Sequence, residues 1–339
     1  MGRLAILLPC LLLLLPVGAF AQEASSRQPV GKARLTPEVR QAISNGLAYL
    51  AKTQKEDGSW GDKHPVADTS LALMAFMLQG HVPGRAPYGK NMDRAISYLV
   101  GIGKKGHMGY LGTPNNHAGM YEHGLAILAL SEAWGQSTNP EIRTALKRAV
   151  AVTVHAQNPQ GGWRYNPEPR DADLSMTVMQ ILAISSAKEA GIAVGDDVLQ
   201  NAAKFVLYCQ DETSGGFGYT GPSGPGFART AAGVMSLIMC GQRDHPAVRR
   251  GMIFLRAYPD HKFSGRASHF LYAHYYAIQC MYQLGDADFN AWYPRITKTL
   301  LDKQETSGRW NIREGDAYST SMAILILGVP YRFLPIYQR

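Results

Sequence analysis

The chain has 339 residues, of which 46% are hydrophobic, and it carries a formal net charge of +8. This length and composition allow a large buried core, and one domain of this size is possible when it is built from repeats. The basic residues are spread along the chain rather than gathered in one run, so the charge predicts a solvated surface and no nucleic-acid partner.

The N-terminus has the pattern of a secretory signal. Arg3 precedes an apolar run from Leu4 to Leu15, and the small residues Ala19 and Ala21 follow, which predicts cleavage before Gln22. The mature protein is therefore expected outside the cytoplasm, in the periplasm or secreted. No later stretch reaches the roughly 20 apolar residues that a bilayer requires, so no transmembrane segment is expected.

After this predicted signal, residues 1–21, we expect a flexible N-terminal segment over residues 22–36 and a single domain over residues 37–339. Its cysteines are Cys209, Cys240 and Cys280, an odd number without CxxC spacing, and each lies in an apolar helical pattern. They are predicted to be buried thiols rather than a disulfide framework or a metal site.

The domain repeats a motif in which a Gln precedes a Gly-rich turn and an aromatic residue. Clear copies begin at Gln54, Gln157, Gln210 and Gln304, at separations of 103, 53 and 94 residues. Two separations are about twice the third, and turn-rich segments lie near residues 104 and 258, where the missing copies are expected. The sequence therefore predicts six repeats of about 50 residues.

Each repeat contains a helix with charges on one face and then a helix with almost no charge. The charged helices include 140–157, 246–258 and 293–304, and the apolar helices are expected at 69–80, 124–131, 174–187, 230–241, 275–285 and 320–329. A helix that is apolar nearly all round must be covered on more than one side. The pattern predicts an all-α fold with charged helices outside and apolar helices inside, an (α/α)6 toroid of six helical hairpins.

The repeated motif has a structural explanation. The Gln side chain can donate to backbone groups at a helix end, Gly permits a tight reversal, and the aromatic ring can pack over the junction with the neighbouring hairpin. We therefore expect the motif to join hairpins rather than to carry chemistry.

Several of these segments resemble a known superfamily. QKEDGSW, QNPQGGW and QETSGRW resemble the QW repeats of squalene and oxidosqualene cyclases, and the hairpin period is similar to that of the protein prenyltransferase β subunit. From GLAYLAKTQKEDGSWG to VPYRFLPIYQR, the chain resembles exported bacterial prenyltransferase/squalene-oxidase repeat proteins. The resemblance implies an α/α-toroid with a central cavity, a fold that serves cyclases, transferases, polysaccharide lyases and non-catalytic domains.

In such a ring, the first residues of the inner helices and the turns before them surround one mouth of the cavity, so the polar residues there are site candidates. The segment RDADLSMT resembles the DxDD acid motif of class II terpene cyclases, with Asp173 at the proton donor's position and Leu174 in place of the last acid. A pair of carboxyls two residues apart could share a proton as a general acid. The predicted catalytic residues are Asp173, Asp171, Glu122, His123 and His274.

Helix capping is the alternative explanation for these acids. Three of the inner helices begin near an Asp, where a carboxylate satisfies free backbone N–H groups and the positive end of the helix dipole. The positions concerned are Asp68, Asp171 or Asp173, and Asp316.

Aromatic and charged side chains near the same mouth are predicted to bind a ligand. Aromatic faces can stabilise carbocations or stack on sugar rings, although packing is their commonest role. An Arg that enters an otherwise uncharged helix needs an anionic partner, which could be Asp173, Glu122 or a ligand. The predicted ligand-binding residues are Arg229, Tyr272, Tyr275, Tyr276, Tyr318, His269, Asp68 and Asp316.

The sequence predicts no cofactor and no metal ligand. Tyr272 and His274 stand where the prenyltransferase β subunit has the Asp-x-Cys of its zinc site, and Ser319 stands at the position of its His. Zinc-dependent prenylation is therefore not expected. A divalent metal on His269, His274 and His123 is left open, but these histidines lack ligand spacing.

Three functions are compatible with these observations, and whether the chain catalyses a reaction is left open. The first is a terpenoid-cyclase-like or prenyltransferase-like protein that binds an isoprenoid or another apolar ligand. The second is a polysaccharide-active or glycan-binding toroid, such as a lyase or hydrolase. The third is a scaffold that binds another protein and has no chemistry.

Overall fold

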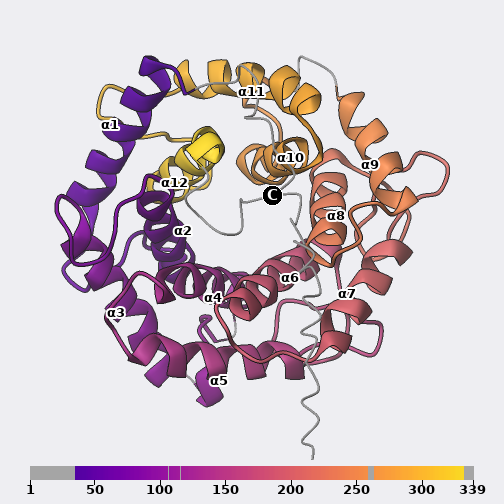
Figure 1. The fold of residues 1–339 in the computed structure, drawn as a ribbon, viewed down its shortest axis with the longest axis horizontal. Coiled ribbons are helices and arrows are strands. Elements are labelled where there is room, and N and C mark those ends of the chain that lie inside the picture. Colours follow the sequence, from indigo (N-terminus) through magenta and orange to yellow (C-terminus); the bar gives the residue numbers. More distant parts are fainter. Residues whose placement is uncertain (1–34, 106, 115, 259–262, 332–339) are drawn as a thin grey trace, which may run out of the picture.

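Figure 1 shows a computed structural model of the chain, which describes residues 35–105, 107–114, 116–258 and 263–331. Residues 1–21, the predicted signal, and residues 22–34 of the predicted flexible segment lie outside the described residues. The outer helices are α1 (Pro37–Thr53), α3 (Gly89–Lys105), α5 (Glu141–His155), α7 (Asp196–Tyr208), α9 (Pro246–Arg256) and α11 (Asp286–Leu301). The inner helices are α2 (Pro65–Leu78), α4 (Gly119–Trp134), α6 (Leu174–Glu189), α8 (Phe227–Met239), α10 (Phe270–Leu284) and α12 (Asp316–Leu327). Among the described residues there are also two short 3-10 helices, η1 (His107–Gly109) and η3 (Val329–Tyr331).

The two rings follow from the distribution of apolar residues. In α2 every residue from Val66 to Leu78 is buried, because outer helices cover one side and neighbouring inner helices cover the others. In α3 only one face is buried, through residues such as Met92, Ile96 and Leu99. The inner ring closes where α12 packs against both α10 and α2. The predicted all-α (α/α)6 toroid of six hairpins is confirmed.

Each inner helix begins at its predicted span or up to five residues before it. The extra residues carry the polar side chains of the first turn, which an apolar pattern does not reveal. Asp68 and Asp316 are therefore inside the first turns of α2 and α12 rather than at their N-caps, which are His64 and Gly315. Of the acids offered as caps, Asp173 is the N-cap: its Oδ1 accepts from the Met176 N–H at 2.9 Å.

The glutamine of each clear motif bonds its own turn to the next outer helix. The side-chain Nε2 of Gln157 donates to the carbonyl of Gly161 at 2.8 Å and to that of Val198 in α7 at 2.9 Å. Gln304 donates in the same way to Gly308 and to Ala42 of α1, both at 2.8 Å, which joins the last hairpin to the first. These contacts show the predicted joining role of the glutamines. The backbone carbonyl that accepts from each glutamine in the neighbouring outer helix lies near the start of that helix.

The aromatic residue of the motif bonds the outer and inner helices of its own hairpin. The indole Nε1 of Trp163 donates to the Thr153 carbonyl of α5 at 2.7 Å, and its backbone N–H donates to Oγ1 of Thr177 in α6 at 3.1 Å. Trp60 and Trp310 make the equivalent pairs of bonds. All three indoles are almost fully buried, so each adds a large apolar area to the junction.

The described helices also bear on two other predictions. None of them combines the length and the apolarity that a membrane crossing would require. Cys209, Cys240 and Cys280 are free thiols, of which Cys209 and Cys280 are buried and Cys240 is half-buried.

Replacing a joining glutamine should lower the free energy of unfolding. Gln157→Ala removes two hydrogen bonds to backbone carbonyls, and we expect a loss of about 1–3 kcal/mol. Gln160→Ala, an exposed position in the same turn, is the matched control and should change stability little. Urea unfolding of both variants is the measurement, and equal stabilities of the two would contradict the joining role.

Candidate functional site

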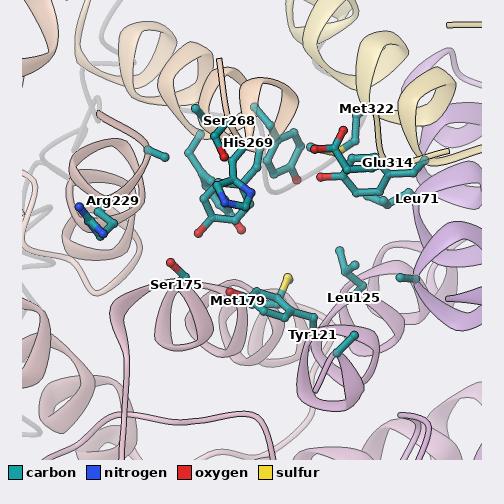
Figure 2. Close-up of a pocket in the computed structure, with 18 of the residues that line it drawn as sticks. Leu71, Tyr121, Leu125, Ser175, Met179, Arg229, Ser268, His269, Glu314 and Met322 are labelled. Atoms are coloured by element: carbon teal, nitrogen blue, oxygen red, sulfur yellow. The ribbon is translucent and has the colours of Figure 1, made fainter. Parts of the chain in front are cut away.

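The inner ring encloses a cavity of about 930 Å³ (Figure 2). All six inner helices contribute to its wall, together with the turns that precede them. Aliphatic and thioether groups line part of it, including Leu71, Leu125, Met179 and Met322. Eight tyrosines line it as well, namely Tyr121, Tyr165, Tyr219, Tyr258, Tyr272, Tyr275, Tyr276 and Tyr318.

The tyrosines give the wall aromatic faces and neutral hydroxyl groups. Burial raises the pKa of Tyr272, Tyr276 and Tyr318 above its ordinary value, so these phenols stay protonated at neutral pH. Tyr165 and Tyr219 share a hydrogen bond between their hydroxyls, from turns that lie 54 residues apart in sequence. This wall can contact an apolar ligand and still donate hydrogen bonds to it.

Asp68 is the predicted site acid that the structure places in the cavity wall. It is 9% exposed, and burial, followed by the negative charge of Glu122, raises its pKa to about 7. Gly61 has a φ of 70°, and a Cβ at that position would overlap Oδ2 of Asp68, so a glycine is needed to leave room for the carboxyl. Asp68 therefore exchanges a proton near neutral pH, as a general acid or base requires.

Glu122 does not line the cavity, but its charge acts on Asp68 and raises the pKa of that carboxyl. It is fully buried, its Oε2 accepts from the Thr113 N–H at 2.7 Å, and its Oε1 lies 3.3 Å from Nδ1 of His64. His64 lines the cavity and is partly exposed. The carboxyl of Glu122 thus places a negative charge near Asp68 and contacts the imidazole of His64.

Asp173 and Asp171 do not line the cavity as the partial acid motif predicts. Asp173 is fully buried, and burial raises its pKa, against the Met176 hydrogen bond and the charge of Arg164. The Nε of Arg164 lies 3.6 Å from Oδ2 of each Asp. Asp173 serves as a cap paired with an arginine, and the exposed Asp171 shares that arginine.

His123 takes a structural place in the ring. Its Nδ1 accepts from the Leu111 N–H at 3.0 Å, and its Nε2 lies 3.2 Å from the Ala149 carbonyl and 3.1 Å from Oγ1 of Thr153. In the degenerate second repeat, His123 thus accepts the hydrogen bond from a backbone N–H that a threonine hydroxyl accepts in the clear copies. Burial lowers its pKa to about 3, so the ring is neutral and bonded on both nitrogens.

His274 is enclosed by aromatic rings outside the cavity lining. Its ring centroid lies 4.6 Å from that of Phe270, 4.8 Å from that of Phe263 and 5.7 Å from that of Trp292. Burial, followed by the charge of Arg295, lowers its pKa to about 3, so His274 is a neutral packing residue. The predicted catalytic role of His274 has no support from this placement.

Among the predicted ligand-binding residues, Arg229, His269, Asp68 and the four tyrosines line the cavity. Asp316 does not. Its Oδ2 is paired with Nη1 of Arg309 at 2.6 Å and lies 3.3 Å from the Tyr49 hydroxyl. In the described residues, no group of three or more His, Cys, Asp or Glu side chains could hold a metal ion.

Several cavity residues were missed by the sequence analysis. Tyr165 and Tyr219 stand two residues after the motif aromatics Trp163 and Phe217, a spacing that could have identified them. Glu314, whose pKa burial raises, lies in the turn before α12 and has no such signal.

Comparisons with known proteins show the fold alone. No protein-family model and no curated protein matches the chain. The type II terpene cyclase MstE from Scytonema is similar in structure, with a TM-score of 0.60 and 16% identity over 88% of this chain and 98% of the cyclase. An inactive variant of the α-1,6-mannanase GH76A of Salegentibacter sp. HEL1_6, in complex with α-1,6-mannotriose, has a TM-score of 0.65 and 8% identity over 87% of this chain and 99% of the mannanase.

The raised pKa of Asp68 predicts a pH-dependent stability difference. In the folded state Asp68 binds a proton below pH 7, whereas in the unfolded chain it does so only below about pH 4. This group therefore makes wild-type stability fall as pH rises from 4 to 7, and Asp68→Asn abolishes the loss. We expect the variant to gain stability over wild type with rising pH, by at most about 4 kcal/mol at pH 8.

Thermal and urea unfolding between pH 4.5 and 8 would measure this gain. Asp171→Asn, at an exposed carboxyl outside the cavity lining, is the control for the loss of one carboxylate. A stability difference between Asp68→Asn and wild type that stays constant with pH would show that Asp68 is ionised throughout.

Proposed function

We propose that this toroid binds an isoprenoid or a similarly long apolar ligand in its central cavity, as a terpenoid-cyclase-like protein. The observation that supports this most is the wall itself: a 930 Å³ space lined by tyrosines, leucines and methionines, with few charged groups. Ligand pockets of roughly 300–1,000 Å³ with this kind of lining suit ligands that are largely apolar. The structures of MstE include one in complex with geranylgeranyl dihydroxybenzoate, described as its substrate.

Asp68 is the candidate proton donor in this proposal. It lines the cavity and keeps its proton to about pH 7 because it is buried beside Glu122, whereas Asp173 caps α6 and pairs with Arg164 outside the lining. The aromatic faces of Tyr121, Tyr272 and Tyr276 would stabilise positive charge that develops on a protonated ligand. The export predicted from residues 1–21 is part of the same proposal, which makes this a protein of the periplasm or the exterior.

A glycan is the second candidate ligand. The wall offers eight phenol groups that can stack on sugar rings and bond to their hydroxyls, together with the carboxyls of Asp68 and Glu314. The mannanase GH76A has the same overall ring. Competing probes can separate the two ligands.

The test uses the full chain with tritiated geranylgeraniol and follows co-elution from a size-exclusion column. Wild type should retain the probe. Leu125→Trp places an indole in the cavity and should weaken retention by about tenfold or more, which corresponds to at least 1.4 kcal/mol. Ile253→Trp, an exposed position on α9, is the matched control and should retain the probe as wild type does.

Two results would overturn the proposal. One is a wild type that retains neither geranylgeraniol nor an anionic derivative of it, and the other is equal retention by Leu125→Trp. Calorimetry with α-1,6-mannotriose is run in parallel, and binding of this sugar without binding of any of these isoprenoids would replace the isoprenoid by a glycan.

A further inference from the structure

Arg229 is a cation in the cavity wall that has no carboxylate partner among the described residues. It is half-buried at the start of α8, and its Nη2 donates to the Gly224 carbonyl at 2.6 Å. Its buried Nε has no acceptor in the part of the chain that the structure describes. A cation removed partly from water without an anion is costly, unless a ligand supplies the anion.

The carboxylates that could have paired with Arg229 are held elsewhere. Asp173 lies beside Arg164, and Glu122 lies beside His64. The two carboxyls that line the cavity, Asp68 and Glu314, belong to α2 and to the turn before α12. Figure 2 shows Glu314 across the open space from Arg229, and Figure 1 shows α2 on the side of the ring opposite α8.

The backbone around Arg229 adds to the positive potential. The guanidinium lies against the preceding loop, where a Cβ on Gly226 would be 2.9 Å from Nη2. Gly226 is the N-cap of the 13-residue helix α8 and offers no side-chain cap, and residues 226–229 all line the cavity. The free N–H groups and the dipole of a helix start favour an anion, here beside an unpaired guanidinium.

We propose that the cavity ligand carries an anionic head group, a carboxylate or a phosphate ester, that binds to the Arg229 guanidinium beside the start of α8. Its apolar chain then runs past the tyrosines of α10 toward Leu71, Leu125 and Met322 on the far side of the cavity. This inference rests on the proposed function, because it assigns a charge and an orientation to the same ligand. The two head groups share the chemistry that Arg recognises in forked hydrogen bonds.

Three probes with the same chain test the head group: geranylgeraniol, geranylgeranoic acid and geranylgeranyl phosphate. Wild type should bind at least one of the two anions about tenfold or more tightly than the alcohol, as charge-assisted hydrogen bonds predict. Which anion binds more tightly distinguishes the carboxylate from the phosphate ester.

Arg229→Met should bring the affinity for the anions down to that for the alcohol in the same variant, so that the preference of about tenfold or more is lost. Arg229→Lys, which keeps the charge but not the fork, should retain part of the preference. Arg170→Met removes an exposed arginine that pairs with Glu168, and it should behave as wild type. Thermal melting of each variant shows whether it is folded, and Arg229→Lys carries the test if Arg229→Met is not.

The outcomes separate this inference from the proposed function. If the alcohol and both anions bind equally to wild type, the anionic head group is wrong, and if the preference survives in Arg229→Met, Arg229 is not its site. In both cases the isoprenoid cavity stands. If Arg229→Met is unfolded, a preference in Arg229→Lys equal to that of wild type overturns the forked recognition of the head group. If none of the three probes binds to wild type, the proposed function itself fails.

Discussion

The ring depends on the hydrogen bonds that each joining glutamine makes to the next outer helix. A helical hairpin has one apolar helix that it cannot cover alone, and only its neighbours can bury the rest. The bond from Gln304 to Ala42, across 262 residues of sequence, has the same form as the bond from Gln157 to Val198, across 41. Closure is therefore made by the same contact as every other clear joint, and in the described residues each inner helix packs against an inner helix on either side.

The polar residues buried in this ring fall into two groups, those bonded within the protein and those that line the cavity. His123, Asp173 and Asp316 are fixed by bonds that hold helices or turns together, and their hydrogen-bonding or charge capacity is largely used there. Asp68 lines the cavity beside another acid, and Arg229 lines it with one backbone acceptor but no carboxylate partner among the described residues, which is costly in a largely apolar wall. These two residues, rather than the richest cluster of polar residues, mark where a ligand can contribute.

The sequence predicted the fold because period and charge asymmetry are properties of whole helices. It predicted the site less well because a single step along a helix turns a side chain by about 100°. Tyr121 lines the cavity, whereas Glu122 and His123, the next two residues, point into the surrounding protein. Aligned helix starts therefore identified four of the eight tyrosines that line the cavity. They could not distinguish side chains that point into the cavity from side chains that point into the surrounding protein for most of the acids and histidines.

The separation of Arg229 from Asp68 matters for what the cavity can do. An arginine close to Asp68 would favour its ionised form and remove the proton that burial and Glu122 retain. With the cation on the α8 side and the acid on the α2 side, an anionic head group can bind to Arg229 while Asp68 keeps its proton. For the proposed anionic ligand, the same separation sets the direction of binding, because its charged end is attracted to Arg229. A toroid that kept its shape but exchanged these two positions would thus bind the ligand reversed.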